Sequence, residues 1–150
     1  IIPEEVFMEG TIRTFDEAYR DKIHQEITTV AENVANAHNA RVEIQFAPYG
    51  RYPVTINDPE LAKSLMPSLA NASEGKFYEM PVPRTGAEDF SFFQEKVPGL
   101  YLFVGGRAKD MPASKAPDHH TPEFQIDESG MRLGVKLLTN LTLDYMSNHH

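Results

Sequence analysis

The chain has 150 residues, a formal net charge of −8, 41% hydrophobic and 24% charged residues, and no cysteine. This composition is typical of a globular chain, excludes disulfides and thiolate metal sites, and argues against a nucleic-acid partner. No apolar run reaches the roughly 20 residues that span a bilayer, so we expect no membrane partner. The start at Ile1 has neither Met nor a signal pattern, which predicts a cut inside a longer protein. We expect a cytoplasmic protein, although an upstream segment could carry an export signal.

The first third of the chain predicts a β-α-β unit. Residues 4–15 and 41–46 alternate between apolar and polar residues, as strands with one buried face do. Between them, residues 17–38 repeat apolar residues at helical spacing, and Asp16 is placed to cap that helix. The predicted buried faces comprise Val6, Met8 and Ile12, then Val42, Ile44 and Phe46, and on the helix Tyr19, Ile23, Ile27, Val30 and Val34.

The composition changes near residue 50, and we place a domain boundary between residues 50 and 58. The elements predicted after it are a helix from Pro59 to about Asn71, a short strand over 76–80, a short helix over 87–96, a strand buried on both faces over 99–106, and a last helix capped by Asp127. Pro67 should kink or break the first of these helices. The last helix should turn Met131, Val135, Leu138, Leu141 and Tyr145 toward a core. We interpret the two terminal histidines, residues 149–150, as the remnant of an affinity tag.

Two adjacent histidines, His119 and His120, end a polar loop that follows the predicted buried strand. Neutral imidazole is the commonest metal ligand, and such a loop can present it to a cleft. Adjacent side chains of an extended backbone point apart, so only one of the pair is expected to bind a metal. Zinc sites need about four ligands, and this chain offers far fewer. Without further context, a solvated pair is the better explanation.

Two other segments could bind a substrate. Thr85-Gly86-Ala87 precedes Glu88 and Asp89 at the predicted helix start, where free backbone N–H groups hold carboxylates or developing oxyanions. The two acids are explained equally well as ordinary residues of a first helical turn. Arg51 lies at the domain boundary and suits bidentate recognition of a carboxylate, although a solvent-exposed arginine is just as common there.

Several stretches, taken in order along the chain, resemble the aminoacylase and carboxypeptidase-G metallopeptidases, that is, metallopeptidase family 20. The similarity is greatest to its amidohydrolase branch, which includes N-acyl-amino-acid amidohydrolases, hippurate hydrolases and indole-acetyl-amino-acid hydrolases. The stretches are Ile2-Pro3-Glu4-Glu5-Val6, Gly10-Thr11-Ile12-Arg13-Thr14-Phe15-Asp16, Tyr52-Pro53-Val54, Asn57-Asp58-Pro59, Thr85-Gly86-Ala87-Glu88-Asp89-Phe90-Ser91-Phe92-Phe93, Pro98-Gly99-Leu100-Tyr101, Gly105-Gly106, His120-Thr121-Pro122-Glu123-Phe124 and Asp127-Glu128.

The resemblance implies an α/β fold, of which this chain is the C-terminal part of a two-domain zinc-peptidase-like enzyme. Residues 1–54 would be the second half of a ferredoxin-like lid that forms a homodimer, and residues 55–148 the closing part of the α/β catalytic domain. Two divalent ions, zinc, manganese or similar, would occupy the complete active site. His120 would be the one metal ligand in this chain, with His119 beside it as a residue that supports the ligand. No catalytic residue maps here, because the general-base glutamate is expected upstream.

The resemblance also assigns substrate binding to Arg51 and to the loop Thr85-Gly86-Ala87. The implied activity is metal-dependent cleavage of the amide bond of small-molecule substrates, N-acyl amino acids or small peptides, with the isolated chain inactive. The alternative is a non-enzymatic β-α-β module for dimerisation or small-ligand binding. The combination of Gly86-Ala87-Glu88-Asp89 with His120-Thr121-Pro122 favours the enzyme, because a pure interaction module has no reason to carry it.

Overall fold

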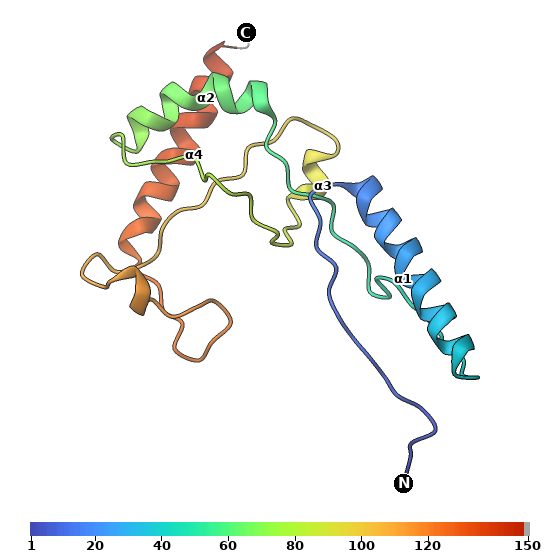
Figure 1. Cartoon of the computed structure of the whole chain (residues 1–150). Helices are drawn as coiled ribbons and strands as arrows, with labels where there is room; N and C mark the ends of the chain where they lie inside the picture. Colours follow the sequence, from blue (N-terminus) through green and yellow to red (C-terminus); the bar gives the residue numbers. More distant parts are fainter. Residues whose placement is uncertain (149–150) are drawn as a thin grey trace. The chain divides into compact units, whose positions relative to one another are not determined.

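A computed structural model describes residues 1–148, and the predicted tag remnant at 149–150 lies outside the described residues (Figure 1). The chain divides into two compact units. The first comprises Ile1–Ile56 and Val82–Val97, and the second comprises Asn57–Pro81 and the chain from Pro98 onward. The sequence predicts a boundary between residues 50 and 58, but it does not predict the return of residues 82–97 to the first unit. The assignment of the two parts to a lid and a catalytic domain stays a prediction.

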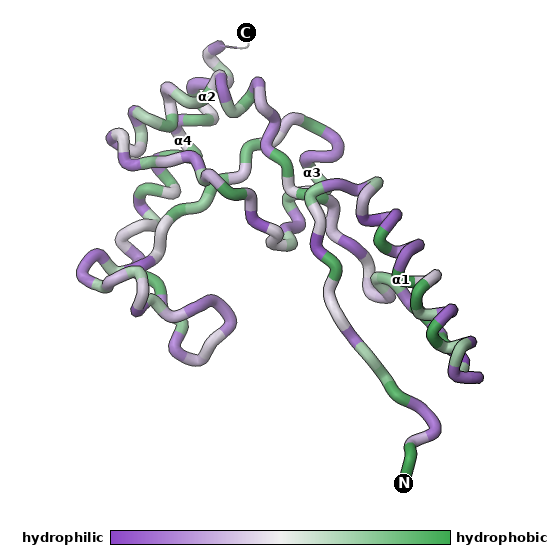
Figure 2. Tube along the Cα trace, viewed as in Figure 1, coloured by the Kyte–Doolittle hydropathy of each residue, from purple (hydrophilic) through white to green (hydrophobic). Residues whose placement is uncertain are grey.

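The first unit contains α1, Glu17–Ala37, as the helical periodicity predicts. Asp16 caps it, with its carboxylate accepting a hydrogen bond from the backbone N–H of Tyr19 at 2.6 Å. Hydrophobic residues recur along the helix (Figure 2), yet the predicted apolar face is largely exposed, with Val30 at 59%. The one buried residue of α1 is Arg20. The apolar spacing therefore predicts the helix correctly but not what its face packs against.

The predicted strands are wrong for the described residues, because residues 1–148 contain no strand. The alternating segments 4–15 and 41–46 are extended or irregular. Residues 99–106 were predicted as a strand buried on both faces, but they form no strand and Phe103 is 70% exposed. Alternation reports that one side of a segment is apolar. A strand also needs a neighbouring backbone for its ladder of hydrogen bonds, and these segments do not pair with one another. The described chain thus consists of helices and irregular segments, not of the expected α/β layers.

The second unit is built on two helices that pack against each other, α2, Pro59–Ala72, and α4, Ser129–Asn148 (Figure 1). Asp58 caps α2 by accepting from the N–H of Leu61 at 2.8 Å, as the sequence predicts. The expected break at Pro67 does not occur, and α2 continues through it. Burial on both sides of Pro67 offsets the lost backbone hydrogen bond. The apolar core between the helices comprises Leu65, Ala72, Leu137 and Leu141.

Only part of the face predicted for α4 is buried. Leu141 lies in the core, but Leu138 is 69% exposed, because α4 is covered by α2 along one narrow side. The exposed members of the predicted face are Met131, Val135, Leu138 and Tyr145. Within residues 1–148, no helix combines the length and the apolar content that crossing a membrane requires.

The glycines of the irregular segment 99–106 lie close to the start of α4. The backbone N–H of Asp127 donates to the carbonyl of Gly106 at 2.7 Å. A Cβ atom on Gly130 would come within 2.8 Å of the carbonyl oxygen of Gly105, which is closer than real Cβ contacts allow. The close approach of this segment to α4 therefore depends on the glycine at position 130 of the helix.

Candidate functional site

Thr85, Gly86 and Ala87 form an exposed loop of the first unit. A Cβ atom on Gly86 would meet no atom within 4 Å, so the backbone of this loop is open to a ligand. The expected helix over 87–96 is shorter than predicted. It contracts to α3, Ser91–Gln94, and therefore does not begin directly after the glycine.

The two acids after this loop form a turn that leads into α3. The hydroxyl of Ser91 donates to the carbonyl of Glu88 at 2.6 Å, and the carboxylate of Glu88 accepts from the N–H of Phe90 at 3.3 Å. Asp89 is exposed. These contacts agree with the plain explanation that the acids shape the backbone before a helix.

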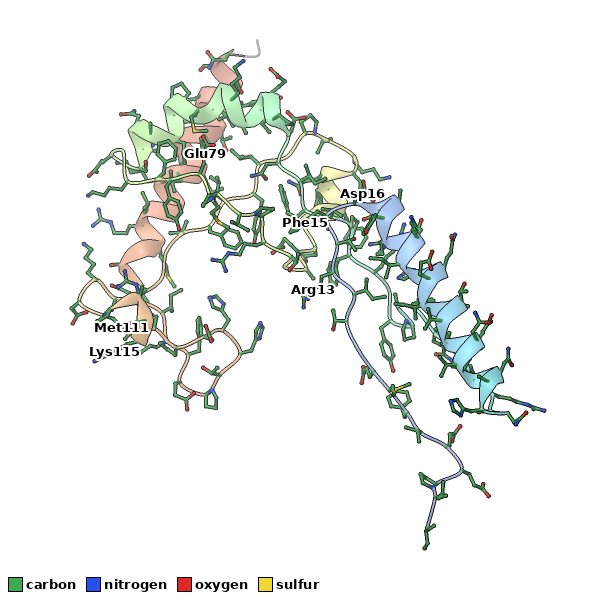
Figure 3. All side chains as sticks on the ribbon, in the orientation of Figure 1. Arg13, Phe15, Asp16, Glu79, Met111 and Lys115 are labelled. Atoms are coloured by element: carbon green, nitrogen blue, oxygen red, sulfur yellow. The ribbon has the colours of Figure 1, made fainter. Side chains whose placement is uncertain are left out.

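One guanidinium reaches this loop from the start of the chain. Nη1 of Arg13 donates to the carbonyl oxygen of Thr85 at 2.6 Å. Figure 3 labels Arg13 where the extended N-terminal segment approaches α1. A second link between the same stretches is the contact of the Tyr52 and Phe92 rings, whose centroids are 5.9 Å apart. Together these contacts join residues 82–97 to residues 1–56.

Arg51 belongs to the same unit, and its side chain is 60% exposed. Its Nη1 lies 3.4 Å from Oε2 of Glu17. The same carboxylate accepts from Arg20 and from the backbone N–H of Val54, the latter at 3.1 Å. The guanidinium of Arg20 also donates to the carbonyl of Tyr52 at 3.2 Å. The Glu17 carboxylate therefore links Arg51 and Val54 to the first turn of α1, and most of the Arg51 side chain remains exposed to solvent.

His120 belongs to the second unit, in an exposed turn. Its backbone is in the left-handed region, with φ at 64°, where residues other than glycine are uncommon and often functional. The His119 ring lies 4.9 Å from the Phe124 ring and 6.5 Å from the His120 ring. The His119 ring therefore contacts an aromatic ring, and the side chains of both histidines are exposed.

Asp127 ends the loop that contains these histidines. Its carboxylate accepts from the backbone N–H of Ser129 at 2.9 Å, and this hydrogen bond lowers the pKa of Asp127 below its ordinary value. The ionised carboxylate is thereby fixed at the start of α4, where the helix dipole also favours a negative charge.

The donor set of residues 1–148 does not form a whole metal site. Among residues 1–148, no group of three or more His, Asp or Glu side chains is arranged to hold a metal ion. His120 offers an exposed imidazole, the commonest ligand for zinc.

The structure groups the sequence-predicted residues in two places. Arg51 and the loop of residues 85–87 belong to the first unit, whereas His119 and His120 belong to the second. The sequence analysis did not single out Arg13 or Glu17, which contact the candidate residues directly. Arg13 stands inside the Gly10–Asp16 stretch that carries the resemblance, and this was the signal that could have found it. For Glu17 no comparable signal exists, because an acid in a first helical turn is ordinary.

Comparison with known proteins gives a family for the chain. The model of peptidase family M20/M25/M40 matches residues 3–144. The chain belongs to this family. It is 35% identical to thermostable carboxypeptidase 2 and to thermostable carboxypeptidase 1 of Saccharolobus solfataricus, in each case over 90% of this chain and 33% of the relative. It is 27% identical to N-acetylcysteine deacetylase of Bacillus subtilis, over 95% of this chain and 35% of that protein.

These relatives place the M20 chain with hydrolases of the peptidase and amidohydrolase type, as the sequence motifs predict. The chain spans about one third of the length of the curated relatives it matches. No solved structure gives a significant match.

Proposed function

We propose that the protein to which this M20 chain belongs is a metal-dependent amidohydrolase that cleaves the amide bond of N-acyl amino acids or small peptides. The observation that carries the proposal is the family match together with the two kinds of relative. A carboxypeptidase and an N-acetylcysteine deacetylase both break an amide bond next to a residue that keeps its free carboxylate. This shared chemistry defines the substrate class that we propose.

In this proposal His120 supplies one ligand to one of two divalent ions, zinc, manganese or similar, and His119 supports it from its place against Phe124. A bound divalent ion would polarise the scissile carbonyl. The other ligands and the general-base glutamate would come from residues outside this chain, so the isolated chain is inactive. The exposed imidazole of His120 and its left-handed backbone support the choice of this histidine.

Arg51 and the loop Thr85-Gly86-Ala87 bind the carboxylate or carbonyl of the substrate in this proposal. The open backbone at Gly86 and the exposed guanidinium of Arg51 support it. We further propose that residues 1–54 belong to a lid domain that forms a homodimer and residues 55–148 to the catalytic domain. The protein would be cytoplasmic, with neither nucleic-acid nor membrane partners. The family match favours this enzyme over the alternative, a non-enzymatic module for dimerisation or small-ligand binding.

The test is an assay of the protein expressed from its whole reading frame and supplied with zinc or manganese. It should release free amino acid from N-acetyl or N-benzoyl amino acids, and chelation should abolish this release. The substitution His120→Ala should lower turnover by more than about a hundredfold, because even loss of a residue that only supports a metal ligand costs 10–100-fold. The bound metal, measured by mass spectrometry, should fall with it.

The exposed histidine His38, at the end of α1, provides the matched control. His38→Ala should leave both turnover and metal content unchanged. Unchanged turnover in His120→Ala would reject the assignment of that residue. Tight stoichiometric zinc in the isolated 150-residue chain would contradict the idea that it holds a single ligand, since one imidazole gives little affinity.

A further inference from the structure

Arg13 connects the start of the chain to the loop of residues 85–87. Its Nη1 donates to the Thr85 carbonyl at 2.6 Å although the two residues are 72 positions apart in sequence. A charged donor at such a distance makes a strong hydrogen bond. Among residues 1–148, no other hydrogen bond reaches the backbone of residues 85–87. The orientation of this loop within its unit therefore depends on one guanidinium.

Other contacts hold only the far side of the loop. After it, the turn at Glu88 leads into α3, and the ring of Phe92 contacts Tyr52. Before it, residues 81–84 are exposed and lie outside any helix. Gly86 is open on its Cβ side. Without Arg13, nothing in the described residues would restrain the rotation of the peptide group that follows Thr85.

The geometry of the peptide bond turns this contact into a restraint on the next N–H. The peptide unit of Thr85 and Gly86 is planar, and no cis peptide bond occurs among residues 1–148, so the Gly86 N–H points opposite to the Thr85 carbonyl. When Arg13 holds the carbonyl, the N–H of Gly86 is directed away from Arg13. The cation also polarises the peptide unit, which strengthens that N–H as a donor.

We propose that Arg13 is a positioning residue that orients the Gly86 N–H toward an anionic or carbonyl oxygen of the substrate. The inference rests on the proposed function, in which residues 85–87 bind that oxygen. Arg13 acts through the Thr85 carbonyl. Its replacement therefore weakens substrate binding and leaves the chemical step largely intact.

The first experiment measures the loop alone. Backbone order parameters of Gly86 and Ala87 are determined by ¹⁵N relaxation in the 150-residue chain, for the unchanged sequence and for three variants. Arg13→Met removes the donor, Arg13→Lys keeps one, and Arg41→Met removes the same charge from another exposed arginine of the same unit. Order parameters should fall toward about 0.6 or below in Arg13→Met. They should stay near the unchanged value in Arg13→Lys and Arg41→Met.

The second experiment measures kinetics in the metal-loaded protein expressed from its whole reading frame. With N-acyl amino acids, Arg13→Met should raise KM about three- to tenfold, the effect of losing one charged hydrogen bond at an exposed position. The kcat should change little, and Arg13→Lys should restore most of the KM. Arg41→Met should match the unchanged protein. This division between KM and kcat, with rescue by lysine, would not arise from a general loss of stability.

The outcomes separate the inference from the function on which it rests. Unaltered order parameters in Arg13→Met would overturn the inference whether or not the protein is active. Lower order parameters with an unaltered KM would also overturn it and leave the proposed function standing. Absence of activity in the unchanged protein would overturn the proposed function, and the substrate role of Arg13 with it. If Arg13→Met fails to fold, Arg13→Lys decides, because a mobile loop in a folded lysine variant contradicts the inference.

Discussion

The packing of α4 on α2 can be tested with two leucines of the same helix. Leu141 is 7% exposed and Leu138 is 69% exposed. The change to Ala removes three side-chain carbons, and each buried carbon contributes about 0.8 kcal/mol. Leu141→Ala should therefore lower the free energy of unfolding by about 2–3 kcal/mol, at the low end of the range for buried leucines, because a small core can partly collapse. Leu138→Ala should cost less than about 1 kcal/mol, since most of that side chain is already in water.

The assay is urea unfolding of the 150-residue chain, followed by far-UV circular dichroism, for both variants and the unchanged sequence. The two substitutions carry the same helix propensity change, so their difference reports burial alone. Equal losses in the two variants, or no loss in Leu141→Ala, would refute the packing of α4 described above. Dilution of the chain should leave the difference between the variants unchanged, because both α2 and α4 belong to one chain.

Two further predictions concern the start of α4. Gly130→Ala should lower the thermal midpoint, because its Cβ would lie 2.8 Å from the Gly105 carbonyl, whereas Gly134→Ala, with its nearest atom at 3.8 Å, should raise it through the better helix propensity of alanine. The pKa of Asp127 is lowered in the folded chain by the Ser129 N–H, so the stability that this cap contributes is present above its unfolded pKa and is lost as the pH falls through its folded pKa. Helicity measured across acidic pH should show this loss, and Asp127→Asn should remove that component.

The helices were predictable because their determinants are local. The carboxylates of Asp16 and Asp58 each bind an N–H three residues later, and the apolar spacing between caps needs no knowledge of the rest of the chain. Even here the sequence was misleading where packing decides. Pro67 predicts a break, yet α2 continues through it, with the buried residues Leu65 and Ala72 on either side.

The strands could not be predicted in this way. The alternation of residues 41–46 states which side chains are apolar, but the ladder that makes a strand is a contact with another segment. In the described residues that contact is absent, and Val42 stays exposed. The same limit applies to α1, where the spacing from Tyr19 to Val34 is regular although most of that face is uncovered.

The same distinction between local features and tertiary contacts applies to the candidate site. Residue chemistry and the resemblance were enough to select His120 and Thr85, and their roles stay predictions. The contact between Arg13 and Thr85 was not predictable, because it spans 72 positions and joins an extended segment to a loop. The pairing of Arg51 with Glu17 spans 34 positions and depends equally on tertiary structure.

The chain changes from one unit to the other after Ile56, Pro81 and Val97. Each unit is therefore assembled from stretches that are distant in sequence. The two stretches of the first unit can meet only when residues 57–81 form a closed loop between them, and the entropic cost of closing a loop grows slowly with its length. A single truncation cannot isolate either unit, because the piece that keeps one unit whole also keeps a stretch of the other. A protein that contains the first unit alone, with the bond between Arg13 and Thr85, must instead lose residues 57–81 and have the ends rejoined.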